Sequence, residues 1–283
     1  MNKSKLLKTI VAIVSVVAIS VGGYTYRDAI HSRIARTAAV VSGQEIKPLL
    51  DSEGRYIRQI VAKDNSTSRT IMWQSDSSEA DAVIEFRVDG SENIQSIGAT
   101  DKVFTDDGST TYIHEGTLTG LTPSTKYEYR VGYGNDRRSD WYSLETAGAS
   151  VYDVLIYPDS QSGDYSGWEQ LVKDSAHRNP RTALYISMGD LVDNGEQDYQ
   201  WRTWLNSIRP LSANVPLAPT LGNHEMYTLD WKMREPRAYL NYFDVPPNGN
   251  ETFNRRYYSY DFGDVHYVVL DTMLYESNHE DNH

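Results

Sequence analysis

The chain has 283 residues, of which 39% are hydrophobic and 23% are charged, a globular composition that excludes a disordered chain. Its formal net charge of −12 argues against a nucleic-acid groove or an anionic lipid surface as the binding partner. Cysteine is absent, which excludes disulfides, cysteine-based zinc sites and a thiol nucleophile. Because the chain is so acidic, an anionic ligand would need bound cations, which would then be the largest local charges.

Residues 1–27 have the pattern of an export signal. Three lysines at the start precede the apolar run Thr9–Gly23, and a basic start followed by an apolar core is the layout of a secretory signal. Counted through Tyr26, the run has about 18 residues, near the lower limit for a membrane span. A cleaved signal peptide and an uncleaved membrane anchor both remain open. In either case the rest of the chain is expected outside the cytoplasm, because the positive end stays inside.

Residues 46–147 alternate short apolar and aromatic segments with turn signals such as Asp89-Gly90. The expected strands are Thr70–Trp73, Ala82–Phe86, Thr111–His114 and Tyr127–Val131. Several short strands without a helical period predict an antiparallel β-sandwich of about 100 residues. The segment Leu121–Tyr127 resembles the tyrosine corner before a late strand of fibronectin type III domains. That resemblance implies a packing module with no chemistry of its own.

Residues 148–283 change to an alternation of strands and helices. Strands are expected at Val154–Tyr157, Ala183–Met188 and Val215–Ala218, and helical spacing marks the segments around Trp168 and Trp204. This alternation predicts a mostly parallel sheet with helices on its faces. Further on, Arg256–Phe262 and Val265–Leu270 flank Gly263-Asp264, which predicts a hairpin.

Polar side chains follow three successive predicted strands. Asp159 follows the first strand, Asp190 the second, and Gly222-Asn223-His224-Glu225 the third. Successive clusters are separated by roughly thirty residues, which is about the length of one strand, one helix and their loops. All three clusters are therefore expected at the carboxyl edge of the sheet, where parallel sheets bind ligands.

The third cluster places an amide oxygen, an imidazole and a carboxylate on one tight turn. A lone Asp after a strand is most often a structural cap. Three such clusters in order and evenly spaced point instead to a functional site. Oxygen ligands and imidazoles are the groups that suit borderline divalent metals.

The order of these motifs resembles that of the calcineurin-like metallophosphoesterases. Within them the chain looks most like the purple acid phosphatase branch, in which a fibronectin-like domain precedes the catalytic one. The resemblance implies two divalent or trivalent metal ions, with Fe, Zn or Mn as candidates. It further implies that Asp159 binds one metal, Asp190 bridges both and Asn223 binds the second. His224 would contact the phosphoryl group of the substrate as an acid or an electrostatic stabiliser.

Two positions depart from the purple acid phosphatase pattern. Asp193 stands three residues after Asp190, where the purple enzymes have the Tyr whose bond to ferric iron gives the colour. Asp193 instead matches the Gly-Asp-x-x-Asp-x-Gly form of the Ser/Thr protein phosphatases, so we expect it to orient His224. Gln161 stands where many members have a ligating His, which predicts that one metal is held loosely or through a water.

The implied fold is a fibronectin type III-like β-sandwich followed by an α/β metallophosphoesterase domain that is incomplete at its C-terminus. The family completes its site with a His after a fourth strand and a Gly-His-x-His turn, and residues 271–283 contain neither. His279 and His283 lie in a polar run that either begins a helix or supplies substitute ligands, whereas His114 and His266 are expected to be structural. The chain is therefore expected to be either a fragment or the product of a reading frame that ends early, and to be inactive alone.

The function expected from the motifs and the resemblance is metal-dependent hydrolysis of small phosphomonoesters. Phosphodiester or nucleotide hydrolysis is the alternative within the same superfamily, because the same site chemistry serves both. A cell-surface binding module without turnover is the alternative of another class. No nucleic-acid surface is expected, and membrane association would come only from the N-terminal segment.

Overall fold

The computed structural model describes residues 54–78, 81–148 and 151–273. Apart from 162–164, these residues belong to one compact unit. None of the helices in these ranges is long and apolar enough to cross a membrane. The predicted export signal at residues 1–27 lies outside the described residues, as do His279 and His283.

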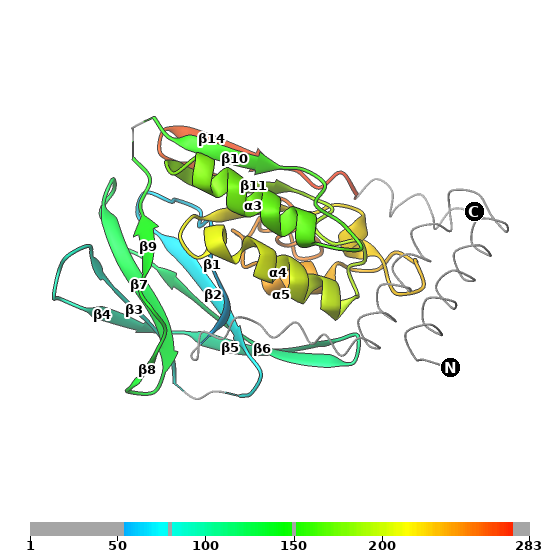
Figure 1. Ribbon diagram of the computed structural model, residues 1–283, viewed down its shortest axis with the longest axis horizontal. Coiled ribbons are helices and arrows are strands. Elements are labelled where there is room, and N and C mark those ends of the chain that lie inside the picture. Colours follow the sequence, from blue (N-terminus) through cyan, green and yellow to red (C-terminus); the bar gives the residue numbers. More distant parts are fainter. Residues whose placement is uncertain (1–53, 79–80, 149–150, 274–283) are drawn as a thin grey trace, which may run out of the picture. The chain divides into compact units, whose positions relative to one another are not determined.

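Two sheets make up the N-terminal part, and one of them continues into the α/β part (Figure 1). The seven-stranded sheet has the order β10-β11-β12-β1-β2-β6-β5. Its strands are β10 (Asp153–Tyr157), β11 (Thr182–Met188), β12 (Leu217–Thr220), β1 (Arg55–Ile60), β2 (Arg69–Ser75), β6 (Ser109–Leu118) and β5 (Thr100–Asp106). The second sheet contains β4 (Gln95–Gly98), β3 (Ala82–Val88), β7 (Lys126–Tyr133) and β8 (Arg137–Arg138), and β9 (Tyr142–Glu145) also pairs with β7.

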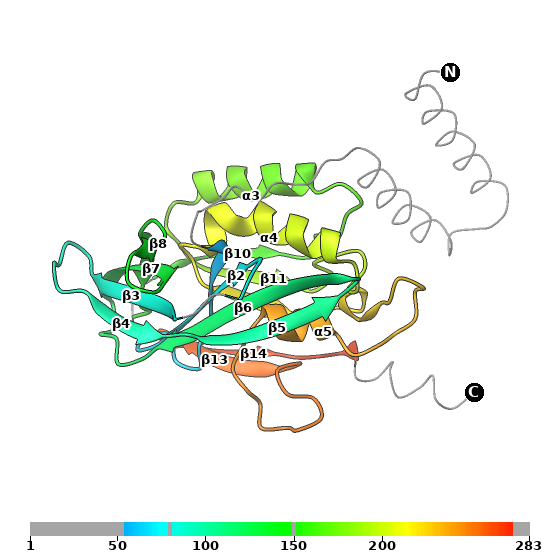
Figure 2. The same cartoon turned by 90° about the horizontal axis from the view of Figure 1, so that it is seen from below.

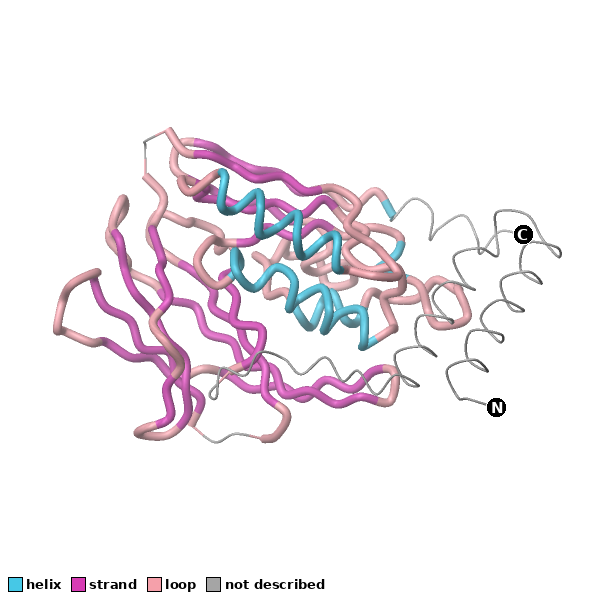
Figure 3. Tube along the Cα trace, in the orientation of Figure 1, coloured by secondary structure: helices cyan, strands magenta, loops and turns pink. Residues whose placement is uncertain are grey.

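Helices are found only after β9 in the described part of the chain (Figure 3). They are α3 (Ser166–Arg178), α4 (Asp198–Ser212), the short 3-10 helix η2 (His224–Met226) and α5 (Arg237–Tyr242). Strands β13 (Tyr258–Phe262) and β14 (Val265–Val269) form the predicted hairpin. Figure 2 shows α3 and α4 on one side of the sheet and α5 with the β13–β14 hairpin on the other.

The parallel arrangement of the α/β strands is confirmed. β10 pairs with β11 and β11 with β12, all in parallel. Trp168 and Val172 of α3 are buried, and so are Trp204 and Ile208 of α4, as their helical spacing predicted. The carboxyl ends of the three strands therefore lie along one edge of the sheet, which is the placement that the site requires.

Strands β1 and β2 lie between two hydrophobic cores, which the local sequence did not reveal. Ile60 and Met72 pack into the core of the α/β part, whereas Ile57 and Trp73 pack into the core between the two sheets of the sandwich. Strand β1 also pairs in parallel with β12, where Val61 donates its backbone N–H to Leu217 at 3.1 Å. Because both faces are covered, these strands lack the polar–apolar alternation of a half-exposed sheet.

The polar side chains of β1 join the two parts of the fold. Arg58 is 1% exposed and donates to the carbonyl of Tyr242 at the end of α5. Gln59 is fully buried and donates to the carbonyls of Ser143 and Ala213. Buried polar groups cost free energy unless they are hydrogen-bonded, so these bonds fix the position of β1 against both parts.

The tyrosine corner expected from the sequence is present. The backbone N–H of Thr122 donates to the hydroxyl of Tyr127 at 2.9 Å. Tyr127 is 5% exposed and begins the buried face of β7. This contact fixes the connection between β6 and β7.

Candidate active site at the carboxyl edge of the parallel strands

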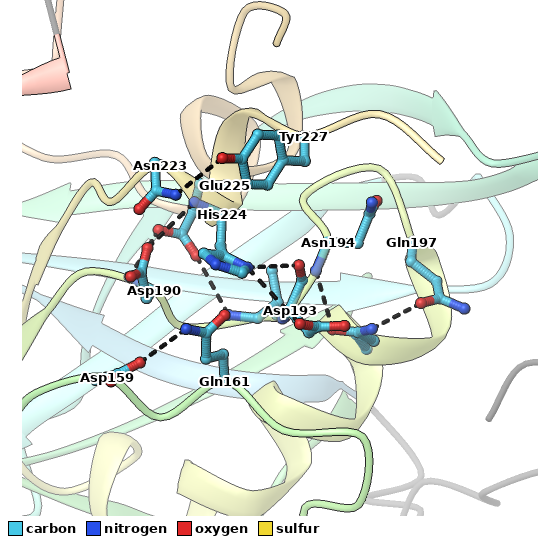
Figure 4. A network of polar contacts seen from close by, with 12 residues as sticks. Asp159, Gln161, Asp190, Asp193, Asn194, Gln197, Asn223, His224, Glu225 and Tyr227 are labelled. Carbon is cyan, nitrogen blue, oxygen red and sulfur yellow. Dashed lines mark hydrogen bonds and ion pairs between the residues drawn. The ribbon is translucent and has the colours of Figure 1, made fainter. Parts of the chain in front are cut away.

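The loops that follow β10, β11 and β12 meet at one edge of the sheet and carry the predicted residues. Asp159 follows β10, Asp190 follows β11, and Asn223 with His224 follows β12. Figure 4 shows these side chains grouped together with Gln161, Asp193 and Glu225. The structure therefore brings together all the residues that the motifs singled out in the described part of the chain.

The backbone at two of the aspartates is held in an unfavourable conformation. Asp159 has φ +50° and Asp190 has φ +48°, in the left-handed region that residues with a Cβ seldom adopt. Such a conformation costs on the order of 1–3 kcal/mol and persists only where surrounding contacts fix it. One such contact is the bond from the Gln161 backbone N–H to the Asp190 carbonyl, at 2.9 Å.

Two glycines allow the second and third loops to approach each other. A Cβ on Gly222 would lie 2.2 Å from Oδ1 of Asp190 and 2.4 Å from its backbone nitrogen. Gly189 has φ +79°, and a Cβ there would lie 3.1 Å from the Cα of Gly222. The glycine of each motif is therefore required by the contact between the loops.

Glu225 cross-links the same two loops from below the surface. Its side chain is fully buried and accepts four backbone N–H groups. Oε2 accepts from Asp190 at 3.0 Å and from Gly222 at 2.8 Å, and Oε1 accepts from Leu191 at 2.7 Å and from Val192 at 3.2 Å. Both oxygens act as acceptors, which suits an ionised carboxylate.

The protonation of Glu225 is subject to opposing influences. Burial raises the pKa of Glu225 to about 7, and the nearby charge of Asp190 acts in the same direction. The hydrogen bonds from Gly222, Val192 and Leu191 lower the pKa, because they stabilise the charged form. The backbone donors thus offset part of the cost of burying a charge beneath the site.

His224 is held at two points by the loop that follows β11. Its backbone N–H donates to Oδ1 of Asp190 at 3.1 Å. Its ring Nδ1 lies 2.7 Å from the backbone carbonyl of Asp193 and 3.7 Å from the carboxylate of that residue. A carbonyl can only accept, so Nδ1 carries a proton and donates it to this bond. Nε2 is then the nitrogen left for other chemistry.

The predicted pairing of Asp193 with His224 therefore takes a form that the sequence did not indicate. The main-chain carbonyl of Asp193 makes the closer contact, and its carboxylate stands further off, at 3.7 Å. The loop is fixed by Gln200 of α4, whose side-chain oxygen accepts the backbone N–H of Asp193 at 2.6 Å. Asp193 can thus orient the ring through the backbone and stabilise a positive charge on it through the carboxylate.

Asn223 and His224 are bordered by aromatic rings. The amide nitrogen of Asn223 donates to the hydroxyl of Tyr227 at 3.1 Å. The His224 ring meets the ring of Tyr227 edge-on, with centroids 5.2 Å apart, and that of Trp231 at 6.1 Å. Trp231 has φ +61°, a further non-glycine residue in the left-handed region beside the site. The sequence motifs point to neither aromatic residue, because neither belongs to a ligand pattern.

Gln161 stands beside Asp159, as expected from its position in the chain. Its amide nitrogen donates to Oδ1 of Asp159 at 2.9 Å. Its amide oxygen is buried and has no hydrogen-bond partner. A buried acceptor without a partner costs about 1–3 kcal/mol, unless a ligand or a cation occupies the space beside it.

The donor types at this edge fit a metal ion. Asp159, Asp190 and Asn223 contribute carboxylate and amide oxygens at this edge, and Gln161 turns its amide nitrogen toward Asp159. Within the described ranges, no three His, Cys, Asp or Glu side chains converge closely enough to hold a metal ion by themselves. These oxygens are of the kind that could hold a metal together with further ligands.

Histidines elsewhere in the described chain do not contribute to this site. His114 is fully buried in the sandwich and pairs with Asp101 at 2.5 Å. His266 pairs with Asp261 across the β13–β14 hairpin at 2.6 Å. Both have the structural contacts that their positions predicted.

The comparisons with known proteins agree with this arrangement. The family model "Purple acid Phosphatase, N-terminal domain" matches residues 56–146, and the model "Calcineurin-like phosphoesterase" matches residues 139–281, half of the chain. Purple acid phosphatase 13 of Arabidopsis thaliana is 32% identical over 207 residues, which cover 60% of this chain and 38% of that protein. Phosphoenolpyruvate phosphatase of Allium cepa is 27% identical over 172 residues, which cover 56% of this chain and 34% of that protein.

A solved structure shares the fold. The purple acid phosphatase PPD1 from yellow lupin (Lupinus luteus) seeds aligns with a TM-score of 0.65 and 21% identity, covering 76% of this chain and 44% of that chain. The chain thus spans less than half the length of the relatives that it matches. Because the calcineurin-like phosphoesterase model matches half of the chain, the chain belongs to that family.

Proposed function

We propose that this chain acts in the metal-dependent hydrolysis of phosphate monoesters, as an acid phosphatase-like enzyme. The observation that supports the proposal is the grouping of Asp159, Asp190, Asn223 and His224 at the carboxyl edge of β10, β11 and β12. Membership of the calcineurin-like family implies a binuclear metal centre, and oxygen ligands of this kind suit it.

We assign the ligands residue by residue. Asp159 would hold one metal, Asp190 would bridge both, and Asn223 would hold the second through its amide oxygen. The ions would be Fe, Zn or Mn. A metal pair of this kind, when bound, neutralises charge on the phosphoryl group and supplies a nucleophile near neutral pH.

His224 and Asp193 would carry the proton chemistry of the reaction. With Nδ1 donating to the Asp193 carbonyl, Nε2 is the atom from which a protonated ring would donate to the departing oxygen. The Asp193 carboxylate, 3.7 Å from Nδ1, would stabilise the positive charge of that form. General acid catalysis of this kind typically contributes about 10²–10⁴-fold.

The remaining assignments follow the organisation of the chain. Residues 1–27 would be the signal peptide or membrane anchor, 46–147 the fibronectin type III-like domain and 148–283 the N-terminal half of the catalytic domain. The domains would then act outside the cytoplasm on small phosphorylated substrates. A net charge of −12 favours such substrates over nucleic acids.

The test is hydrolysis of p-nitrophenyl phosphate by the full chain with and without added Mn²⁺. Because the described ligands are few, we expect turnover by this chain to be negligible, and any rate above background to require the metal and disappear with EDTA. Bis(p-nitrophenyl) phosphate should react more slowly than the monoester. Turnover clearly above background that is equal in the chain and in Asp190→Ala, or that persists in EDTA, would contradict the proposal.

A further inference from the structure

We propose that Tyr227 is a positioning residue that fixes which end of the Asn223 side-chain amide faces the metal site. The inference rests on the proposed function, since it takes Asn223 as a metal ligand. The structural basis is the hydrogen bond from the amide nitrogen of Asn223 to the hydroxyl of Tyr227, at 3.1 Å. Figure 4 shows the nitrogen turned toward Tyr227 and the amide oxygen on the side of Asp190.

The chemistry of the amide explains why it needs such a partner. Only its oxygen can ligate a cation, whereas the NH₂ group carries partial positive charge and would repel one. The terminal torsion of Asn is broad and roughly two-fold, so the two ends exchange easily unless a neighbour distinguishes them.

Without Tyr227, the surroundings of Asn223 would favour the amide orientation in which the NH₂ group, and not the oxygen, faces the metal site. The carboxylate of Asp190 lies on the metal side, and a carboxylate attracts the NH₂ group of an amide more than its oxygen. A bond to Tyr227 occupies the NH₂ group and holds it away from Asp190. Without the phenol, we expect the amide to turn its NH₂ group toward Asp190, so that metal binding would first have to reverse it.

The hydroxyl of Tyr227 is itself held in a fixed position. Its ring packs against the rings of His224 and Trp231, with centroid distances of 5.2 Å and 5.4 Å. Its backbone carbonyl accepts the N–H of Glu196 at 3.1 Å, and its backbone pairs with Met233 in an isolated antiparallel bridge. A partner anchored on both its ring and its backbone can orient a ligand, as outer groups around metal sites commonly do.

The variant that isolates the effect is Tyr227→Phe, which removes one oxygen and keeps the ring. The dissociation constant for Mn²⁺ is measured on the full chain near pH 7 by electron paramagnetic resonance of the free ion. We expect Tyr227→Phe to raise it by about 10-fold or more, the range typical of lost outer-shell partners. Tyr258→Phe is the matched control, because it also loses one tyrosine hydroxyl bond, to the carbonyl of Pro219 at 2.7 Å.

A double-mutant cycle separates positioning from general destabilisation. Asn223→Ala removes the ligand, so adding Tyr227→Phe to it should change the Mn²⁺ dissociation constant no further. An additional loss of the same size in the double variant would show that Tyr227 acts independently of Asn223 and would overturn the inference.

The remaining outcomes are also decisive. An unchanged dissociation constant in Tyr227→Phe, beside a raised one in Asn223→Ala, would refute the role of Tyr227 and leave the proposed function standing. No Mn²⁺ binding by the unmodified chain at millimolar metal would refute both. An equal effect from Tyr258→Phe would show that the loss reflects stability alone.

Discussion

The buried carboxylate of Glu225 accepts the backbone N–H of Asp190 at 3.0 Å, which ties the residue proposed to bridge two metals to the motif that follows the neighbouring strand. The bond lies on the interior side of the loop. The same carboxylate accepts the N–H of Gly222, so it holds the second and third loops together. The positions of the candidate ligands thus depend on a side chain that is buried beneath them.

We predict that Glu225→Gln destabilises the fold. The amide would replace one acceptor oxygen by an NH₂ group that faces two backbone donors, and leaving buried donors unsatisfied costs about 1–3 kcal/mol each. Urea unfolding should therefore show a loss of roughly 2–6 kcal/mol. Glu169→Gln on α3 is the control, since its pairing with Lys173 is exposed and surface pairs contribute about 0–1 kcal/mol. Equal losses in the two variants would contradict the role assigned to Glu225.

The contact between the loops gives a second prediction. Gly222→Ala should destabilise the protein by about 1–3 kcal/mol, because its Cβ would overlap Oδ1 and the backbone nitrogen of Asp190. The change should also weaken Mn²⁺ binding, since the Asp190 side chain must move. Gly167→Ala in α3, where nothing lies within 4 Å of the added Cβ, should be neutral or stabilising by up to about 1 kcal/mol. A Gly222→Ala variant with unchanged stability and unchanged metal affinity would show that the loops can separate freely.

A third prediction concerns the proton carried by His224. If Nε2 donates to the departing oxygen, His224→Ala in an enzyme with a complete metal site should lose about 10²–10⁴-fold on an alkyl phosphate and much less on p-nitrophenyl phosphate, whose leaving group needs little protonation. Asp193→Asn keeps the backbone carbonyl that accepts from Nδ1, so its loss should show the same dependence on the leaving group but be smaller. Relative rates on the two esters provide the measurement. Equal losses on both esters for His224→Ala would make it a phosphoryl-binding residue and end the acid assignment.

The buried tyrosines give a prediction about alkaline pH. Burial raises the pKa of Tyr56 to about 12 and raises the pKa values of Tyr239 and Tyr258 well above the ordinary value of 10.0. Below the ordinary value these phenols stay protonated in both the folded and the unfolded state. Above it the unfolded state loses its phenolic protons first, so stability falls as the pH rises, through the window from 10.0 to about 12 for Tyr56.

The measurement for this prediction is tyrosinate absorbance near 295 nm beside far-ultraviolet circular dichroism. A fraction of the tyrosines should ionise only together with the loss of secondary structure. Complete ionisation at about pH 11 with the circular dichroism spectrum intact would contradict the burial of these side chains.

The sequence predicted the parts of the fold that depend on local patterns. Helical spacing located Trp168 and Trp204 on buried faces, and the turn before Tyr127 predicted the tyrosine corner. The pairing of Ile60 with Leu217, by contrast, joins segments that are far apart in the chain. No local pattern in β1 specifies that partner, so the continuity of the seven-stranded sheet from the sandwich into the α/β part could not be predicted.

The residues of the candidate site likewise fall into those that a sequence pattern reveals and those that it does not. The ligand-type residues Asp159, Asp190 and Asn223 could be found because each follows a strand and together they form a spaced pattern. The buried role of Glu225 could not be found, since its four partners are backbone N–H groups, which no sequence motif displays. Likewise, the contact between Tyr227 and Asn223 depends on the shape of one short 3-10 turn.

The most direct test of the proposed metal centre is metal-dependent binding of inorganic phosphate, because it requires the metal site and the phosphoryl site together and does not require turnover. Equilibrium dialysis of the full chain with labelled phosphate, in the presence and absence of millimolar Mn²⁺, provides the measurement. We predict binding only when Mn²⁺ is present, and a loss of that binding in Asp190→Ala, which removes the carboxylate proposed to bridge the metals. Phosphate binding that is independent of Mn²⁺, or that persists unchanged in Asp190→Ala, would contradict this prediction.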